Sequence, residues 1–257
     1  MNKKYVFLDI DGTLVINDAI SDSTLRALQQ AQKNGHEIVL CTGRSMCQIF
    51  PFLLEKFPFD GIVSSSGANI QRHGKAVVRH VFPKSITKPL FEFFEARGSH
   101  YTIHTHDRLY NSLPDRERML AWYVSDGQTI EEAFPGRVFL EHPEELPDIE
   151  MVAFMDEALE EVTRCFSDVC HISPGELTMK GIHKGSGIRE YIEHCGGSMA
   201  DTVAIGDSSN DVGMLSSAAY GVAMGNAEEL LKPLADFVTD DIEKDGIQKA
   251  FFRLGLI

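Results

Sequence analysis

The chain has 257 residues, of which 43% are hydrophobic and 24% charged, a composition typical of a folded globular protein rather than a disordered chain or a coiled coil. Lys and Arg number 24 against 38 Asp and Glu, and the net charge of -14 opposes binding to nucleic acid or to an anionic membrane. A phosphate-bearing ligand would therefore need a local cationic group.

The N-terminus and the cysteines indicate a cytosolic protein. No signal-peptide pattern opens the chain, and no apolar stretch is long enough to span a bilayer. The 5 cysteines are odd in number and contain no CxxC pair, which argues against a disulfide framework or a thiolate zinc site. We interpret all of them as small buried apolar side chains: Cys41, Cys47, Cys165, Cys170 and Cys195.

An apolar run from Tyr5 to Leu8 directly precedes Asp9, Asp11 and Gly12. The run is typical of a strand buried on both faces of a parallel sheet. In an extended chain Asp9 and Asp11 project to the same side, so we expect their charges to repel and to raise one pKa, which a bound cation would relieve. The alternative is that both acids cap the turn at Gly12.

Strand and helix patterns then alternate up to about residue 68. Residues 21–35 predict a helix with Ser21 or Asp22 as its N-cap and Gly35 as its stop. A second strand is expected from Glu37 to Cys41, a helix over 45–57 and a short strand over 61–67. This is a βαβ pattern, so the crossover should be right-handed.

The pattern changes after Pro83, where short paired strands are separated by helices. We expect a helix over 84–98 with Pro89 in its first turn, and a hairpin over 100–112 with His106 and Asp107 near its turn. The remaining predictions are helices at 117–127 and 157–169, a loop at 141–148, and strands at 149–155, 170–175 and 176–182. These elements suggest a small α+β domain with an open sheet.

The α/β pattern resumes at Lys184. Helices are expected at 185–197, 210–218, 227–235 and 247–255, and strands at 202–207, 220–224 and 236–239. The predicted fold is therefore α/β: a doubly wound, mostly parallel Rossmann-like core from residues 1–82 and 183–257, with an α+β domain of residues 83–182 inserted into it.

Polar motifs follow the strands that are predicted to be parallel. The carboxyl edge of an open α/β sheet is where ligands bind. The motif residues are Asp9 and Asp11 in "DIDGT", Thr42 in "CTGR", Lys184 in "GIHKG", and Asp207, Asn210 and Asp211 in "GDSSND". Acids, a hydroxyl, an amide and one cation together suit a hard divalent metal beside a phosphoryl group.

The order of these motifs, with the insertion between the second and third, resembles the haloacid dehalogenase-like superfamily of phosphohydrolases, in its Cof-type branch with a C2B cap. The resemblance covers essentially the whole chain. It implies a Mg²⁺-dependent phosphatase for a small phosphorylated metabolite. A sugar phosphate is the first expectation, with nucleotides and pyridoxal phosphate behind it.

The resemblance also assigns roles. It implies Asp9 as the nucleophile that forms an aspartyl-phosphate, Asp11 as general acid and then general base, and Lys184 as the cation that offsets the charge on Asp9 and the phosphate, rather than a solvated surface lysine. The implied substrate-binding residues are Gly12, Thr42, Gly43, Asn210 and Ser66. The implied metal ligands are Asp9, Asp11 through its main-chain carbonyl, Asp207, and Asp211 either directly or through another ligand.

Some features fit the resemblance less closely. The family commonly has "NGA" where this chain has Ser66 followed by Gly and Ala, so a hydroxyl replaces an amide. His104 and His106 have a His-x-His spacing that suits a metal, but a polar surface is the alternative; with Arg108 they form a candidate contact for the leaving group. Glu176 matches a motif position at the junction of cap and core, or is simply a loop acid.

Two other functions remain open from the sequence. A phosphomutase would share the acid pair Asp9 and Asp11, whereas ion-pumping ATPases have Thr in place of Asp11, and the dehalogenases lack this acid. A sensor of phosphate ligands could keep the site without turnover. The sequence predicts no oligomeric state.

Overall fold

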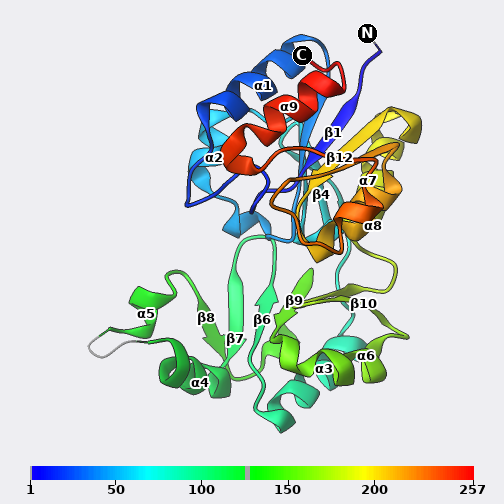
Figure 1. Ribbon diagram of the computed structural model, residues 1–257. Coiled ribbons are helices and arrows are strands. Elements are labelled where there is room, and N and C mark those ends of the chain that lie inside the picture. Colours follow the sequence, from blue (N-terminus) through cyan, green and yellow to red (C-terminus); the bar gives the residue numbers. More distant parts are fainter. Residues whose placement is uncertain (1, 125–127) are drawn as a thin grey trace. The chain divides into compact units, whose positions relative to one another are not determined.

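The computed structural model describes residues 2–124 and 128–257, and its contacts divide the chain into two compact units. The first unit comprises Met1–Arg44, Gln48–Arg79 and Ile182–Ile257, and the second comprises Ser45–Cys47 and His80–Gly181. Each unit is built on its own β-sheet (Figure 1).

The sheet of the first unit has the strand order β14-β13-β12-β1-β2-β3-β4-β5. It is parallel from β14 to β3, and β4 and β5 continue it as an antiparallel hairpin. The strands are β1 (Tyr5–Leu8), β2 (Glu37–Cys41), β3 (Gly61–Ser64), β4 (Asn69–Arg72), β5 (Lys75–Arg79), β12 (Thr202–Gly206), β13 (Tyr220–Ala223) and β14 (Phe237–Val238). The predicted α/β class with a mostly parallel core sheet is confirmed.

Helices connect these strands: α1 (Asp22–Lys33), α2 (Pro51–Lys56), α7 (Lys184–Cys195), α8 (Val212–Ser217) and α9 (Gly246–Arg253). Helix α1 packs beside α9, and α7 packs beside α8 (Figure 1). The connection β1-α1-β2 runs to one side of β1, whereas β12-α8-β13 runs to the other side, so right-handed crossovers place α1 and α8 on opposite faces. The carboxyl end of β1 therefore lies at the switch point where ligands bind in such sheets.

The local sequence explains why strand β1 and helix α1 form where they do. All residues of β1 are buried, as expected for a central strand covered on both faces. Helix α1 begins after Ser21, whose side chain accepts a hydrogen bond of 3.1 Å from the backbone N–H of Thr24. Gly35 follows with a φ of 92°, which stops the helix. Both elements are confirmed.

The sheet of the second unit has the order β10-β11-β9-β6-β7-β8, and it is antiparallel except between β7 and β8. Its strands are β6 (Tyr101–His104), β7 (Leu109–Ser112), β8 (Val138–Leu140), β9 (Met151–Phe154), β10 (Cys170–Ser173) and β11 (Glu176–Met179). Its helices are α3 (Lys84–Arg97), α4 (Leu113–Tyr123), α5 (Ile130–Ala133) and α6 (Leu159–Phe166). An inserted α+β sheet is thus present, and the 100–112 hairpin is confirmed as β6 and β7.

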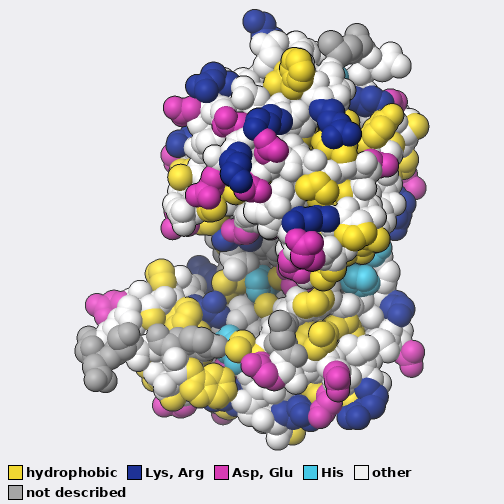
Figure 2. Space-filling view, viewed as in Figure 1, with side chains coloured by type: hydrophobic (Ala, Val, Ile, Leu, Met, Phe, Trp, Pro, Cys, Tyr) yellow, Lys and Arg dark blue, Asp and Glu magenta, His cyan; other side chains and the backbone are white. Residues whose placement is uncertain are grey.

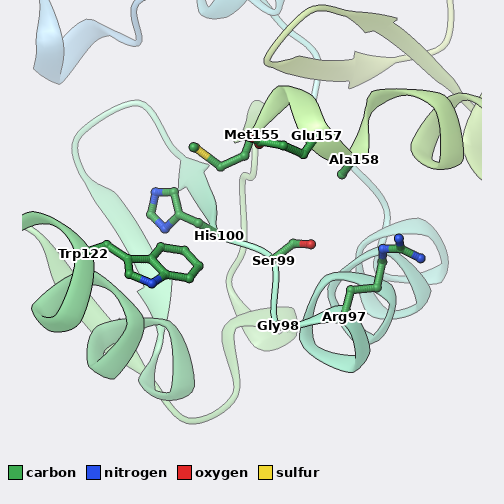
Figure 3. A pocket seen from close by; sticks show the side chains of 8 residues that line it. All are labelled: Arg97, Gly98, Ser99, His100, Trp122, Met155, Glu157 and Ala158. Carbon is green, nitrogen blue, oxygen red and sulfur yellow. The ribbon is translucent and has the colours of Figure 1, made fainter.

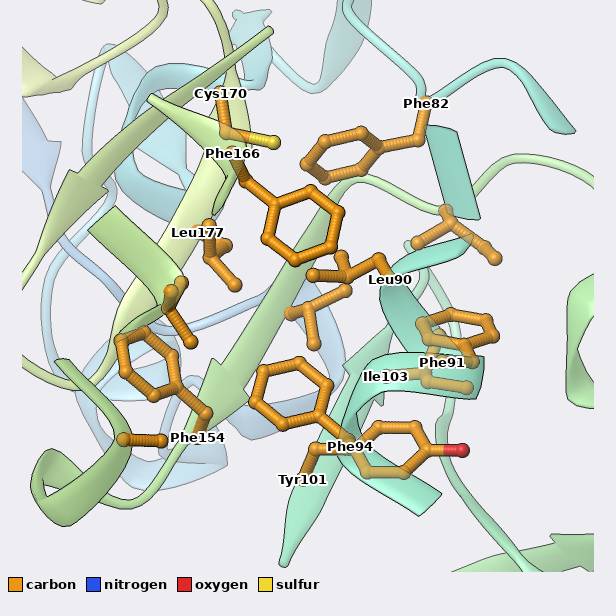
Figure 4. Packing of buried hydrophobic residues seen from close by; sticks show 14 residues of the cluster. Phe82, Leu90, Phe91, Phe94, Tyr101, Ile103, Phe154, Phe166, Cys170 and Leu177 are labelled. Carbon is orange, nitrogen blue, oxygen red and sulfur yellow. The ribbon is translucent and has the colours of Figure 1, made fainter. Parts of the chain in front are cut away.

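This second unit has its own aromatic core (Figure 4). Tyr101, at the start of β6, stacks against Phe91 and Phe94 of α3 with ring centroids 5.2 Å and 5.1 Å away. Phe94 also contacts Phe154 of β9 at 5.9 Å. Burying one Phe side chain stabilises a fold by about 1.5–3 kcal/mol. This cluster of aromatic side chains therefore stabilises the second unit through a hydrophobic core of its own.

The helix predicted over 84–98 is confirmed as α3, but prolines account for two other helix predictions that were wrong and for a wrong position within α3. Residues 45–57 form a 3₁₀ turn at Met46–Gln48 and then α2, because Pro51 disfavours the helical conformation in Phe50, whose ψ is 121°. Residues 227–235 contain only the 3₁₀ turn Lys232–Leu234, at Pro233. Pro89 lies inside α3, not in its first turn, at a solvent-exposed position where water can replace the lost hydrogen bond.

Further boundaries also differ from the predictions. Helix α4 begins at Leu113, four residues before the expected start, because Ser112 caps it; its predicted end at 125–127 lies outside the described residues. Helix α6 is shorter than 157–169. Strands β4, β5 and β8 and helix α5 were not predicted. The other 3₁₀ turns are Ser65–Gly67, Pro143–Glu145, Asp156–Ala158, Met199–Asp201, Ser209–Asp211 and Ile242–Lys244.

The charged side chains and the cysteines show further features of the molecule. On the face shown in Figure 2, basic side chains are dispersed among acidic ones. All the cysteines are free, but the prediction that all are buried was wrong, since Cys47 and Cys165 are exposed and Cys195 is partly exposed. Among the described helices, none combines the length and apolar character that crossing a membrane requires.

Candidate active site

The predicted motif residues of the first unit meet at the carboxyl edge of its parallel sheet. Asp9 follows β1 directly and is only 5% exposed, while its backbone N–H donates to the carbonyl of Ile205 of β12 at 3.1 Å. Thr42 follows β2, and Asp207 follows β12. Lys184 is the first residue of α7. Elements far apart in the sequence thus place their polar ends together.

Lys184 is the buried cation at the centre of this site. Its Nζ donates to Asp9 Oδ1 at 2.7 Å, to Asp211 Oδ1 at 2.6 Å and to Asn210 Oδ1 at 2.9 Å. Its side chain is 1% exposed, so the interpretation as a solvated surface lysine is wrong. One ammonium group cannot neutralise several carboxylates, and the site keeps an excess of negative charge.

That excess appears in the pKa values. Burial raises the pKa of Asp9 well above its usual value; Lys184 opposes this rise, and Asp211 and Asp207 add to it. Burial likewise raises the pKa of Asp207 to about 6. The expected elevated pKa is therefore present at Asp9, but its causes are burial and the acids after β12, not Asp11.

Three carboxylates are close enough to share a cation. Oxygens of Asp9, Asp207 and Asp211 lie within 4.8 Å of one another, and within the described ranges no other group of three or more metal-binding side chains comes together. Carboxylate oxygens are the ligands that hard divalent cations prefer. The donor set and the excess negative charge both fit a divalent cation.

Asp211 and Asp207 differ in their remaining contacts. Asp211 Oδ2 accepts from the backbone N–H groups of Asp207 at 2.9 Å and Ser208 at 3.1 Å, so both of its oxygens are engaged. The side chain of Asp207 accepts one hydrogen bond, from Thr13 Oγ1 at 2.7 Å. Asp207 is thus the more available ligand.

Asp11 is not one of the three clustered carboxylates. Its carboxylate forms a two-pronged ion pair with Arg44, whose Nε and Nη2 donate at 2.7 Å and 2.8 Å. Arg44 also stacks over the Phe50 ring, with its Cζ 4.1 Å from the centroid. Asp9 and Asp11 thus have different cationic partners, Lys184 and Arg44, on either side of the end of β1 and the turn at Gly12, where φ is 77°.

The turn after β3 borders the same edge. Thr42 is 1% exposed; its Oγ1 accepts from the N–H of Arg44 at 3.1 Å, and its carbonyl accepts from the N–H of Ser66 at 3.1 Å. Ser65 and Ser66 have φ values of 49° and 51°, in the left-handed region that non-glycine residues seldom adopt. Such backbone conformations concentrate at functional sites. Gly43 lies between Thr42 and Arg44, partly exposed.

Three further residues of this edge were not identified from the sequence: Thr13, Arg44 and Asn226. Asn226 Nδ2 donates to the carbonyl of Gly12 at 2.9 Å, and its Oδ1 accepts from the N–H of Ile242 at 2.9 Å. Thr13 and Arg44 lie inside the motifs "DIDGT" and "CTGR", so their place in these motifs could have identified them as site residues. Asn226 follows β13 at the same edge.

The histidine pair of the second unit belongs to no group of three or more candidate metal ligands among the described residues. Strand β6 ends at His104, so His106 lies in the turn and the two do not alternate on one strand. Burial is the main cause that lowers the pKa of His104 to about 3, which keeps its imidazole neutral. His106 and Arg108 lie in the turn, and Glu176 opens β11 opposite Ser173 and Ala153.

A pocket of about 460 Å³ in the second unit lacks this chemistry (Figure 3). The Trp122 indole, the His100 imidazole and the Met155 thioether line one part of it. None of the motif residues borders it. The candidate active site is therefore the carboxylate–lysine cluster of the first unit.

The chain is similar to known phosphatases over nearly its whole length. The sequence profile of haloacid dehalogenase-like hydrolases matches residues 6–251. The chain is 28% identical to the 5-amino-6-(5-phospho-D-ribitylamino)uracil phosphatase YcsE of Bacillus subtilis (strain 168), over 96% of this chain and 94% of the relative. It is 25% identical to the pyridoxal phosphate phosphatase YbhA of Escherichia coli (strain K12), over 98% of both.

The fold has a solved counterpart of the same extent. The structure of the HAD subclass IIB sugar phosphatase BT4131 superposes with a TM-score of 0.85 at 29% identity, and it covers 99% of this chain and 100% of its own. The similarity therefore extends over both units.

Proposed function

Because the chain belongs to the haloacid dehalogenase-like hydrolases, we propose that it hydrolyses a small sugar phosphate through an aspartyl-phosphate on Asp9, with Mg²⁺ as its cofactor. It is a phosphatase of subclass IIB, and its substrates are small phosphorylated metabolites. Sugar phosphates are proposed first because a sugar phosphatase superposes on the whole chain. We propose residues 83–182 as the cap domain.

The observation that carries the proposal is the buried pair of Asp9 and Lys184, at 2.7 Å. Keeping a buried carboxylate ionised costs stability, and carboxylates with a strongly raised pKa are common at functional sites. Here Asp9 lies at the switch point of the sheet beside further oxygen ligands. A carboxylate that attacks a phosphate monoester needs nearby positive charge, because charge builds up on the phosphoryl oxygens during the reaction.

The proposed first half-reaction forms the intermediate. An oxygen of ionised Asp9 attacks phosphorus while the bond from phosphorus to the leaving oxygen breaks, and Asp11 gives that oxygen a proton. Lys184 offsets charge on Asp9 and the phosphoryl group. Thr42 and Asn210 hydrogen-bond the phosphoryl oxygens; Lys184 and Ser208 already hold the Asn210 amide oxygen, each at 2.9 Å, so its nitrogen is the end that donates.

The second half-reaction reverses the role of Asp11. Asp11 takes a proton from water, the water oxygen attacks phosphorus, and the bond from phosphorus to Asp9 breaks to release inorganic phosphate. Arg44 donates one hydrogen bond to each oxygen of Asp11 in this structure, which leaves a lone pair on each oxygen for the proton that Asp11 transfers.

The residues proposed to hold Mg²⁺ are Asp9, Asp207 and the main-chain carbonyl of Asp11, with Asp211 bound directly or through another ligand. The cation would supply charge stabilisation as phosphorus becomes five-coordinate. Gly12, Gly43 and Ser66 are the proposed backbone and hydroxyl contacts to the substrate. We propose the cytosol as the setting, since the cysteines are free in the structure.

The test is phosphate release from a panel of sugar phosphates, nucleotides and pyridoxal phosphate, with Mg²⁺ or with EDTA. We expect metal-dependent release that falls by a factor on the order of a thousand or more in Asp9→Asn. Asp18→Asn is the matched control, because it removes the same charge from an exposed loop residue and should keep activity.

Three results would contradict the proposal. Asp9→Asn could release phosphate at the wild-type rate. The wild-type protein could isomerise a sugar phosphate without releasing phosphate, as a mutase does. It could also bind panel compounds tightly with no release over long incubation, as a sensor does.

A further inference from the structure

Thr13 is a buried residue that joins the loops after β1 and β12. Its side chain is 0% exposed, and its hydroxyl donates to Asp207 Oδ1 at 2.7 Å across 194 positions of sequence. A hydroxyl to carboxylate bond of this length is charge-assisted and strong for a neutral donor. The two loops are thus fixed to one another at a carboxylate that has fewer hydrogen bonds than Asp211 and is more available to a cation.

The backbone beside Thr13 also shapes the position of Asp207. A Cβ atom on Gly12 would lie 2.3 Å from Asp207 Oδ2, so the carboxylate lies directly against bare backbone. Asn226, in the segment after β13, holds that backbone through the Gly12 carbonyl, to which its Nδ2 donates at 2.9 Å. Asp207 is therefore confined by Gly12 at one oxygen and oriented by Thr13 at the other.

The hydroxyl of Thr13 carries no charge, which affects how well Asp207 can bind a cation. Lys184 offsets the charge of Asp211 and of Asp9. Thr13 is neutral, so it orients Asp207 without cancelling its negative charge, and it uses one of about four lone-pair sites on the carboxylate. A carboxylate that is oriented yet still charged suits a metal ligand better than one paired with a cation.

We infer that Thr13 is a positioning residue for the divalent cation: its hydroxyl holds Asp207 in the orientation that binds the metal. This inference rests on the proposed metal-dependent function. It concerns a contact of this chain, and it does not depend on which substrate the enzyme uses.

The test measures metal affinity without substrate or turnover. Mn²⁺ is titrated into the protein, and free Mn²⁺ is followed by its electron paramagnetic resonance signal. We expect Thr13→Val, which keeps the shape but lacks the hydroxyl, to bind Mn²⁺ about 10–100-fold more weakly than wild type. Thr13→Ser keeps the hydroxyl and should bind as wild type does.

A merely structural role predicts a different outcome. Thr13→Val would then unfold at lower temperature with and without Mn²⁺, while its Mn²⁺ affinity matched that of wild type, and this result would overturn the inference alone. A wild-type protein that binds no Mn²⁺ would overturn the proposed metal dependence as well. If Thr13→Val fails to fold, Thr13→Ala gives the same comparison against Thr13→Ser.

Discussion

At the scale of single residues, two buried acids show what distinguishes a functional carboxylate from a structural one. Asp9 follows the carboxyl end of β1, and Glu37 opens the amino end of the adjacent parallel strand β2. Glu37 is 3% exposed and accepts from Lys3 at 2.5 Å, Arg72 at 3.0 Å and Tyr191 at 2.6 Å. Its charge is fully compensated, whereas that of Asp9 is not.

The first prediction concerns Glu37. Burial alone would raise its pKa, but hydrogen bonds from Arg72, Lys3 and Tyr191 outweigh that effect and lower it from 4.5 to about 2. A lowered folded-state pKa contributes stability above pH 4.5 that is lost as the pH falls towards 2. We expect Glu37→Gln to lower the free energy of unfolding by about 3 kcal/mol at pH 7.

Urea denaturation of both proteins at several pH values measures this contribution. Other acids titrate in both chains, so the difference between wild type and Glu37→Gln is the quantity of interest. It should shrink as the pH falls from 4.5 towards 2. A difference that stays constant over this range would show that the Glu37 charge is not responsible.

At the scale of elements, the turn after β3 is fixed against the start of the helix that carries Lys184. Gly67 has a φ of 99°, and a Cβ atom there would lie 2.4 Å from the carbonyl oxygen of His183. His183 is the N-cap of α7. The glycine therefore permits both the backbone conformation and the close approach that places Lys184.

This arrangement predicts different costs for two glycine substitutions. Gly74, in the β4–β5 turn, also has a positive φ of 72°, but a Cβ atom added there would have no neighbour within 4 Å. Gly74→Ala should cost about 1–2 kcal/mol from backbone strain alone. Gly67→Ala should cost more, because it adds a clash that displaces α7, and it should also lower phosphatase activity.

Thermal denaturation and phosphate release measured on both variants test this difference. Equal losses of stability would mean that the Gly67 contact with His183 is not tight. Full activity in Gly67→Ala would mean that Lys184 does not depend on this turn.

The same elements show which features were predictable. Strands β1, β2 and β12 are continuous apolar runs that end in polar motifs, so local pattern was sufficient. The hairpin of β4 and β5 was missed because most of its side chains are at least partly exposed, which leaves little apolar alternation. The contacts of Asp11 with Arg44 and of Thr13 with Asp207 join distant positions, and no local pattern specifies them.

At the scale of the whole molecule, the proposed reaction groups lie in one unit, and we propose that side chains of the other unit select the substrate. The carboxylates and Lys184 lie in the first unit, while the second unit has its own core and its own sheet. Because the second unit has a core of its own, substitutions on its surface can alter its side chains without moving the reaction groups of the first unit. If the second unit selects the substrate, the motifs of the first unit identify the reaction class without identifying the substrate.

The central claim is that Asp9 carries the phosphoryl group, and intact-protein mass spectrometry after acid quench tests it most directly. The substrate is p-nitrophenyl phosphate, whose leaving group needs no proton from Asp11. Asp11→Asn should therefore form the intermediate but hydrolyse it slowly, because the base that activates water is absent. We expect a gain of one phosphoryl mass in Asp11→Asn, located on the peptide that contains Asp9, and no gain in Asp9→Asn. The account would be contradicted if the wild type hydrolysed this substrate while Asp11→Asn showed no phosphoryl group on Asp9.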